Sequence, residues 1–207
     1  RAKALQDFEP PTPQKIVDFL DNGNAVTVEV LRQQVLQELC DYQRQILGGE
    51  FNTARRFYTK DKEGVLSRLG EVDSANIVAE YLSYTLRHKG IVIDKEHETR
   101  NQNRIDITAS KMLDGQRRLL VIEAKGQWHK ELYNAASTQL YERYSIHPDA
   151  EEQGIYLVFW FGSDESVANT KKHGLTTANE LKLSIESTLS PELKGKIDIF
   201  VLDVSCV

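Results

Sequence analysis

The chain has 207 residues, of which 40% are apolar and 28% are charged, which is enough for one compact domain with a sizeable core. No apolar run approaches the roughly 20 residues that a membrane span needs, so we expect a cytoplasmic protein with no membrane contact. The formal net charge of -5 argues against a protein that coats nucleic acid non-specifically. The two cysteines, Cys40 and Cys206, favour neither a disulfide framework nor a structural zinc site.

Residues 1–70 are predicted to form a small helical subdomain. Residues 12–24 are typical of a short helix, with an N-capping threonine followed by a proline at the first helical position. A second, long amphipathic helix is predicted to end at Gly48-Gly49, because apolar residues recur every three or four positions before it. The polar segment 50–70 is expected to be a broken helix or a loop. Because the chain begins with Arg1, we expect it to be a piece of a longer polypeptide with further domains.

Residues 71–207 are predicted to form an α/β domain in which helices flank a mixed sheet. A helix is expected from Asp73, the candidate N-cap, to Gly90, and three strands follow it. A second helix, a strand that is apolar throughout, a third helix and a last strand complete the order. The expected ranges are 73–90, 91–99, 103–113, 117–126, 128–146, 154–162, 176–189 and 195–205.

Charged residues interrupt two of the apolar strands. Asp106 lies between two isoleucines, and Glu123 and Lys125 follow an apolar run of four residues. Alternate residues of a strand share a face, so Glu123 and Lys125 are expected on the same face. Asp114-Gly115 is typical of a two-residue hairpin turn, and the symmetry of such a turn places Asp106 opposite Glu123. Two carboxylates and an ammonium are therefore predicted to meet at one end of the hairpin.

Two neighbouring carboxylates repel each other unless a positive charge lies between them. A divalent cation with oxygen ligands removes that repulsion, and Mg2+, with Mn2+ as a substitute, suits a site with few protein ligands. The expected ligands are Asp106, Glu123 and the carbonyl of Ala124. Such a cation stabilises the charge that develops in phosphodiester hydrolysis, and Lys125 would hold or polarise the attacking water. The alternative is a lysine–carboxylate pair on an exposed sheet face.

The spacing of these residues resembles that of the PD-(D/E)xK phosphodiesterase superfamily, which includes many restriction endonucleases and Holliday-junction resolvases. Asp106, then sixteen residues, then Glu123-Ala124-Lys125, with a helix on either side, carry the resemblance over about residues 73–161. The literal Pro-Asp pair is absent, because an isoleucine precedes Asp106. The resemblance implies a restriction-endonuclease-like core with the element order α-β-β-β-α-β.

The same resemblance implies two further site residues. Glu80 matches the acidic residue that the family often carries on the first helix of the core, where it serves as a catalytic residue and metal ligand. Gln139 matches a catalytic glutamine that some branches carry on the helix after the lysine strand. In those branches a tyrosine follows four residues later, where this chain has Arg143, and Tyr144 comes one position further on.

The function expected from these residues and this resemblance is a magnesium-dependent deoxyribonuclease that cuts within DNA chains, with RNA still open as a substrate. An acidic net charge agrees with it, because a cluster of metal-binding carboxylates lowers the net charge. The resemblance implies that the chain belongs to a larger bacterial restriction or phage-defence protein. A homodimer is left open. The alternatives are an inactive module of the same fold that binds nucleic acid or protein, and a glycosidase, which has no need of Lys125.

Overall fold

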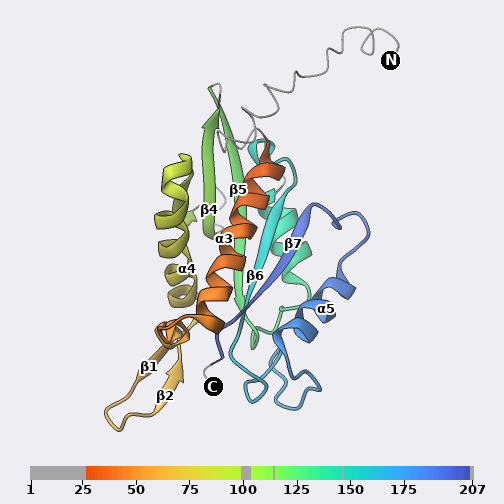
Figure 1. The fold of residues 1–207 in the computed structure, drawn as a ribbon. Coiled ribbons are helices and arrows are strands. Elements are labelled where there is room, and N and C mark those ends of the chain that lie inside the picture. The colour runs from red at the N-terminus through yellow and green to blue at the C-terminus, as the bar shows by residue number, and fades with distance from the viewer. Residues whose placement is uncertain (1–26, 99–103, 114, 146, 206–207) are drawn as a thin grey trace, which may run out of the picture.

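The computed structural model describes residues 27–98, 104–113, 115–145 and 147–205, and shows a five-stranded mixed sheet between two layers of helices (Figure 1). The strands, in the spatial order β3-β4-β5-β6-β7, are β3 (Val92–Glu98), β4 (Arg104–Leu113), β5 (Gln116–Gly126), β6 (Gly154–Trp160) and β7 (Ile197–Asp203). The first three form an antiparallel meander, and the last three run parallel. The expected mixed α/β class is thereby confirmed.

Two helices cover one face of the sheet. They are α3 (Val28–Gly48) and α4 (Glu71–Leu86), and α4 is followed by the 3-10 turn η2 (Arg87–Lys89). The apolar stripe of α3 is buried in one hydrophobic cluster with side chains of α4 and of the central strands. The described part of the predicted subdomain 1–70 therefore shares its core with the sheet. Its boundary at residue 70 stays a prediction, and the short helix over 12–24 lies outside the described residues.

The polar segment between α3 and α4 contains a hairpin that the sequence analysis did not predict. A 3-10 helix η1 (Thr53–Phe57) leads into the two short antiparallel strands β1 (Tyr58–Lys60) and β2 (Leu66–Arg68). The hairpin extends away from the helices and the sheet at the end where α4 begins (Figure 1). Its strands are too short and too exposed to show the alternating pattern that marks a half-buried strand.

The other face of the sheet is covered by the π-helix η3 (Ala136–Ser145), by the 3-10 turn η4 (Pro148–Ala150) beside β5, and by α5 (Ala178–Thr188). The helix predicted from residue 128 thus begins eight residues later. The carbonyls of Gln127 and Trp128 accept hydrogen bonds from Ala168 and Asn169 of a distant turn, and local hydrogen-bonded turns fill the stretch from there to the start of the helix. None of the described helices is long and apolar enough to cross a bilayer.

A buried arginine fastens α3 to the start of β7. The guanidinium of Arg32, with 5% of its side chain exposed, donates to the carbonyls of Gly195 and Lys196 at 2.7 and 2.6 Å and lies 3.1 Å from the carboxylate of Asp198. Because α3 precedes β7 by some 160 residues, this contact joins distant parts of the chain into one core.

We expect Arg32→Met to destabilise the fold by about 3 kcal/mol, because it leaves buried acceptors without their donor while keeping most of the side-chain volume. Arg44→Met, on the exposed side of the same helix, is the matched control and should leave the free energy of unfolding nearly unchanged. Urea denaturation of the three proteins measures both differences. Equal stabilities for the two variants would contradict the structural role of Arg32.

Candidate functional site

The residues predicted for the site meet where β4 begins and β5 ends. The pairs Ile107 with Ile122 and Leu113 with Gln116 are those that a two-residue turn requires, although Asp114 of that turn lies outside the described residues. One position beyond Ile107, the Oδ2 of Asp106 accepts a hydrogen bond of 2.9 Å from the backbone N–H of Ala124. The carboxylate of Asp106 is therefore held directly against the Glu123-Ala124-Lys125 stretch of β5.

Glu123 and Lys125 form an ion pair inside the protein. The Nζ of Lys125 donates to the Oε1 of Glu123 at 2.6 Å, and the two side chains are only 10% and 4% exposed, respectively. The other oxygen, Oε2 of Glu123, is buried and accepts no hydrogen bond from the residues that the structure describes. The pair is thus not the surface salt bridge of an exposed sheet face, and it leaves one buried acceptor unsatisfied.

The electrostatics of the site weaken the ionisation of Glu123. Burial raises its pKa to about 7, and the attraction of Lys125 offsets this only in part, since the charges of Asp106 and Glu71 raise the pKa as well. A carboxyl that titrates near neutral pH beside a charged lysine is not something that packing requires, and such groups are concentrated at functional sites.

Lys125 keeps its positive charge for the converse reason. Burial lowers the pKa of its ammonium, but the negative charges of Glu123, Asp106 and Glu71 outweigh burial and raise the pKa above its ordinary value. The ammonium is therefore a stable hydrogen-bond donor at neutral pH, surrounded by three carboxyl groups.

Glu71 is the residue of this site that the sequence analysis missed. It is the first residue of α4, and its Oε1 accepts a hydrogen bond of 3.1 Å from the backbone N–H of Gly126, directly after Lys125. The helix was expected to begin at Asp73, which placed Glu71 in the preceding loop. An acidic residue at a helix N-terminus is stabilised by the helix dipole, and Glu71 and Asp73 both carry that signal in the sequence.

Glu80, the residue proposed for this role, lies elsewhere. Its carboxylate is exposed and pairs with Arg56 at 2.8 Å. Nine residues separate it from Glu71, which amounts to roughly 13 Å along the helix axis. The structure therefore does not bring Glu80 to the carboxylates of β4 and β5, and we replace it with Glu71 in the site.

Gln139 lies on η3, on the face of the sheet that also carries Glu123. Its side-chain amide donates to the carboxylate of Glu131 at 2.7 Å rather than to a site carboxylate. The charge of Glu131 nevertheless acts on the buried Tyr156, the β6 neighbour of Glu123, together with the charges of Glu123, Glu71 and Asp106. Gln139 is thus near the site through Glu131, and its catalytic role stays a prediction.

The carboxylate oxygens of the site suit a hard divalent cation, but they do not form a complete coordination shell made only of protein ligands. Among the described residues, no group of three or more histidine, cysteine, aspartate and glutamate side chains has the spacing to hold a metal ion. Mg2+ usually binds one or two carboxylates and keeps several waters, so Asp106 and Glu123 are enough protein ligands for it. The Oε2 of Glu123, which accepts no hydrogen bond from the described residues, is one candidate ligand atom. The carbonyl of Ala124 as a further ligand stays a prediction.

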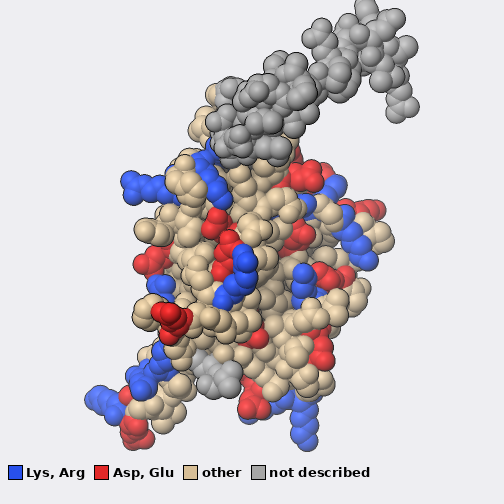
Figure 2. Space-filling model, viewed as in Figure 1, with Lys and Arg blue, Asp and Glu red and all other residues tan. Residues whose placement is uncertain are grey.

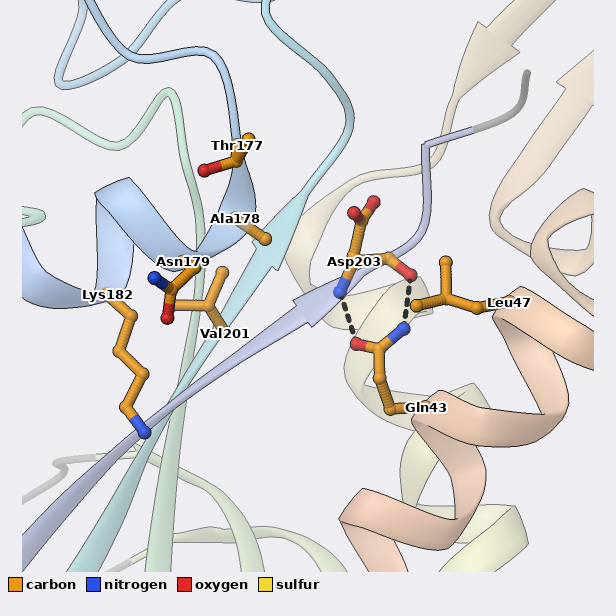
Figure 3. Close-up of a pocket in the computed structure, with 8 residues that line it drawn as sticks. All are labelled: Gln43, Leu47, Thr177, Ala178, Asn179, Lys182, Val201 and Asp203. Atoms are coloured by element: carbon orange, nitrogen blue, oxygen red, sulfur yellow. Dashed lines mark hydrogen bonds between the residues drawn. The ribbon is translucent and has the colours of Figure 1, made fainter.

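A pocket of about 320 Å³ lies at a different place, between α3, the start of α5 and the end of β7 (Figure 3). The side chain of Gln43 crosses to the backbone of Asp203 there, donating to its carbonyl at 2.9 Å and accepting from its N–H at 2.6 Å. This contact fastens α3 to β7, two strands away from β5. The pocket contains none of the candidate catalytic residues.

Comparison with known proteins assigns no class to this site. No family model matches the chain, and neither a curated protein nor a solved structure is significantly similar to it. The chain is a mixed α/β protein with a buried glutamate–lysine pair and two further carboxylates at the end of its sheet.

The raised pKa of Glu123 should make the protein less stable as the pH rises. Below about pH 4.5 its carboxyl is neutral in the folded and unfolded chains, and the stability it contributes is lost as the pH rises through about 7. Glu123→Gln carries no titrating group. We therefore expect the free energy of unfolding of the variant, relative to the wild type, to rise by on the order of 3 kcal/mol between acidic and mildly alkaline pH.

Chemical denaturation at four pH values, in the presence of a chelator, measures this difference. Glu80→Gln, in an exposed pair on α4, is the control for the amide substitution itself. A difference between Glu123→Gln and the wild type that does not change with pH would contradict the buried, easily protonated Glu123.

Proposed function

We propose that this protein is a metal-dependent nuclease of the PD-(D/E)xK type with a restriction-endonuclease-like core. The buried Glu123–Lys125 pair, with Asp106 held against it, is the observation that carries the proposal. The order of α4, β3, β4, β5, η3 and β6 agrees with the α-β-β-β-α-β core that the resemblance implies. DNA is the proposed substrate, and the enzyme is proposed to cut at internal positions of the DNA strand.

In the proposed reaction a water attacks the scissile phosphate and a P–O bond breaks, so one product carries the phosphate and the other a hydroxyl. Bound Mg2+ would supply a Lewis acid for the phosphate oxygens, and Asp106 and Glu123 would hold it. Lys125 lies 2.6 Å from Glu123 and donates hydrogen bonds, so its ammonium is suited to hold the attacking water or to stabilise negative charge on the phosphate. Asp106 accepts from Ala124, which fixes its carboxylate relative to this group.

An inactive module of the same fold is the competing hypothesis. A buried ion pair contributes little to stability compared with apolar side chains of similar volume, so a domain without catalysis has no need of it. A glycosidase would need two carboxyl groups facing a sugar ring, and a lysine paired with one of them has no part in that chemistry. The parent restriction or phage-defence protein, its further domains, the homodimer and the cytoplasmic location remain predictions.

We expect Lys125→Met to reduce cleavage at least about a hundredfold, the usual contribution of a positioned proton donor or acceptor. Methionine keeps the aliphatic packing of the lysine stem, and Glu123 can take up a proton when its partner is lost. Cleavage of circular DNA, linear DNA and RNA is measured with Mg2+, with Mn2+ and with excess chelator. Circular dichroism checks that the variant is folded. Full activity in chelator, or a Lys125→Met protein as active as the wild type, would rule out the proposed mechanism.

The structure distinguishes two glutamates of one helix, Glu71 and Glu80. Glu71→Gln retains an acceptor for the N–H of Gly126 but removes a negative charge from the site, so cleavage should fall by about 10- to 100-fold. The rise in melting temperature on adding Mn2+ should also shrink. Glu80→Gln should leave both quantities unchanged, because its carboxylate pairs with Arg56. The opposite ranking of the two variants would restore Glu80 to the site and remove Glu71.

A further inference from the structure

The hairpin β1–β2 is a rigid projection rather than a loose loop. Its two strands pair from Tyr58 with Arg68 to Lys60 with Leu66. The turn between them is closed by Asp61, whose carboxylate accepts from the N–H groups of Glu63 and Val65 at 2.9 and 2.8 Å. The backbone N–H of Asp61 also donates to the carbonyl of Val65 at 3.1 Å. The acidic side chain of the turn is thus engaged in holding its shape.

The base of the hairpin is fixed to the candidate site at two points. First, only Leu69 and Gly70 separate β2 from Glu71, the first residue of α4. Second, the guanidinium of Arg68 lies 3.3 Å above the ring of Trp128, three residues after Lys125, and pairs with Glu165 at 2.5 Å. The hairpin therefore has a defined position beside the site.

The position of Trp128 is itself tightly constrained. A Cβ added at Gly126 would lie 2.3 Å from the indole ring, so only glycine lets the ring pack against the chain directly after Lys125. The indole is thus enclosed between Arg68 on β2 and the backbone of Gly126. This contact joins the hairpin to the end of the strand that carries Glu123 and Lys125.

The outer part of the hairpin carries unpaired cations and exposed apolar side chains. The side chains of Lys60 and Lys62 are exposed and form no hydrogen bond or ion pair within the described residues. Val65 and Leu66 are 56% and 43% exposed. Figure 2 shows this projection at the lower left, with basic (blue) and acidic (red) side chains together at its tip. The carboxylate of Asp61 is engaged in the turn and Glu63 is exposed there, so the side chains free to contact a partner are those of Lys60, Lys62 and Glu63 and the apolar ones.

We propose that the β1–β2 hairpin enters the major groove of double-stranded DNA next to the scissile phosphate. The proposal rests on the nuclease function proposed above and narrows its substrate to duplex DNA. Lys60 and Lys62 would contact phosphates at the rim of the groove, and Val65 would contact apolar groups of the base edges inside it, such as the methyl group of thymine.

The dimensions of a two-stranded ribbon support this partner. Paired strands lie about 4.8 Å apart, and the major groove of B-form DNA is about 12 Å wide and 8.5 Å deep, which admits such a ribbon with its side chains. Five residues from the base to the turn extend roughly 16 Å, more than the depth of the groove. The major groove of A-form RNA is too narrow for side chains to enter, and a single strand has no groove.

Binding is measured without cleavage, in Lys125→Met protein with chelator, by fluorescence anisotropy over a range of salt concentrations. The probes are a duplex DNA of random sequence, its single strand and a duplex RNA. We expect the duplex DNA to bind most tightly. Replacing Lys60 and Lys62 together by alanine should weaken that binding about tenfold and lower the slope of log Kd against log salt by about 2. Val65→Ser should weaken binding without changing the slope.

The control replaces Lys182 and Lys194 by alanine; Lys194 is exposed, Lys182 is partly exposed beside Glu186, and they lie on and after α5, on the other side of the molecule from the hairpin. This control should bind the duplex DNA as tightly as the Lys125→Met protein without further changes. Unchanged duplex affinity and salt slope in the Lys60 and Lys62 double variant would overturn the hairpin proposal, as would equal binding of all three probes. If that variant instead changes the oligomeric state in size-exclusion chromatography while duplex affinity is kept, the hairpin contacts protein. If the hairpin proposal fails, the nuclease function is still tested separately by measuring DNA cleavage with the wild-type protein.

Discussion

The ion pair between Glu123 and Lys125 is the constraint on which the candidate site depends. Both groups lie inside the protein at the end of a strand in which the four residues before Glu123 are apolar and buried. Removing two charges from water is costly, and their mutual attraction repays that cost only with good geometry and further hydrogen bonds. The contact of 2.6 Å supplies the geometry, but one oxygen of Glu123 is left without a donor. The unfavourable free energy of burial is thus concentrated at the carboxylate of Glu123, and a cation bound there would reduce it.

The surrounding helices and strands hold the buried Glu123–Lys125 pair in place. The N–H of Ala124 fixes Asp106, and the N–H of Gly126 fixes Glu71, so two carboxylates are attached to the backbone on either side of Lys125. The buried cluster beneath α3 and α4 makes the end of β5 rigid, and the enclosed indole of Trp128 limits how the chain can continue. For the proposed hydrolysis, a site held in this way would need little reorganisation when charge develops in the transition state.

Local patterns were sufficient for much of the fold and for the centre of the site. The amphipathic period of α3, the apolar run of β6 and the turn between β4 and β5 are all properties of neighbouring residues. Because side chains alternate along a strand, the turn also places Asp106 beside Glu123. The start of η3 was predicted eight residues too early; residues 127 and 128 accept hydrogen bonds from a turn some 40 residues away, and local turns precede the helix.

The sequence by itself determined which strands carry Asp106, Glu123 and Lys125 and in what register they pair, because those relations are set within one hairpin. Only the tertiary structure decided that Glu71 and not Glu80 joins them, since that depends on where α4 begins and which of its ends meets β5. It also decided the burial of the ion pair and the place of the β1–β2 hairpin. These features arise from contacts between residues far apart in the chain, and periodicity and turn chemistry carry no information about such contacts.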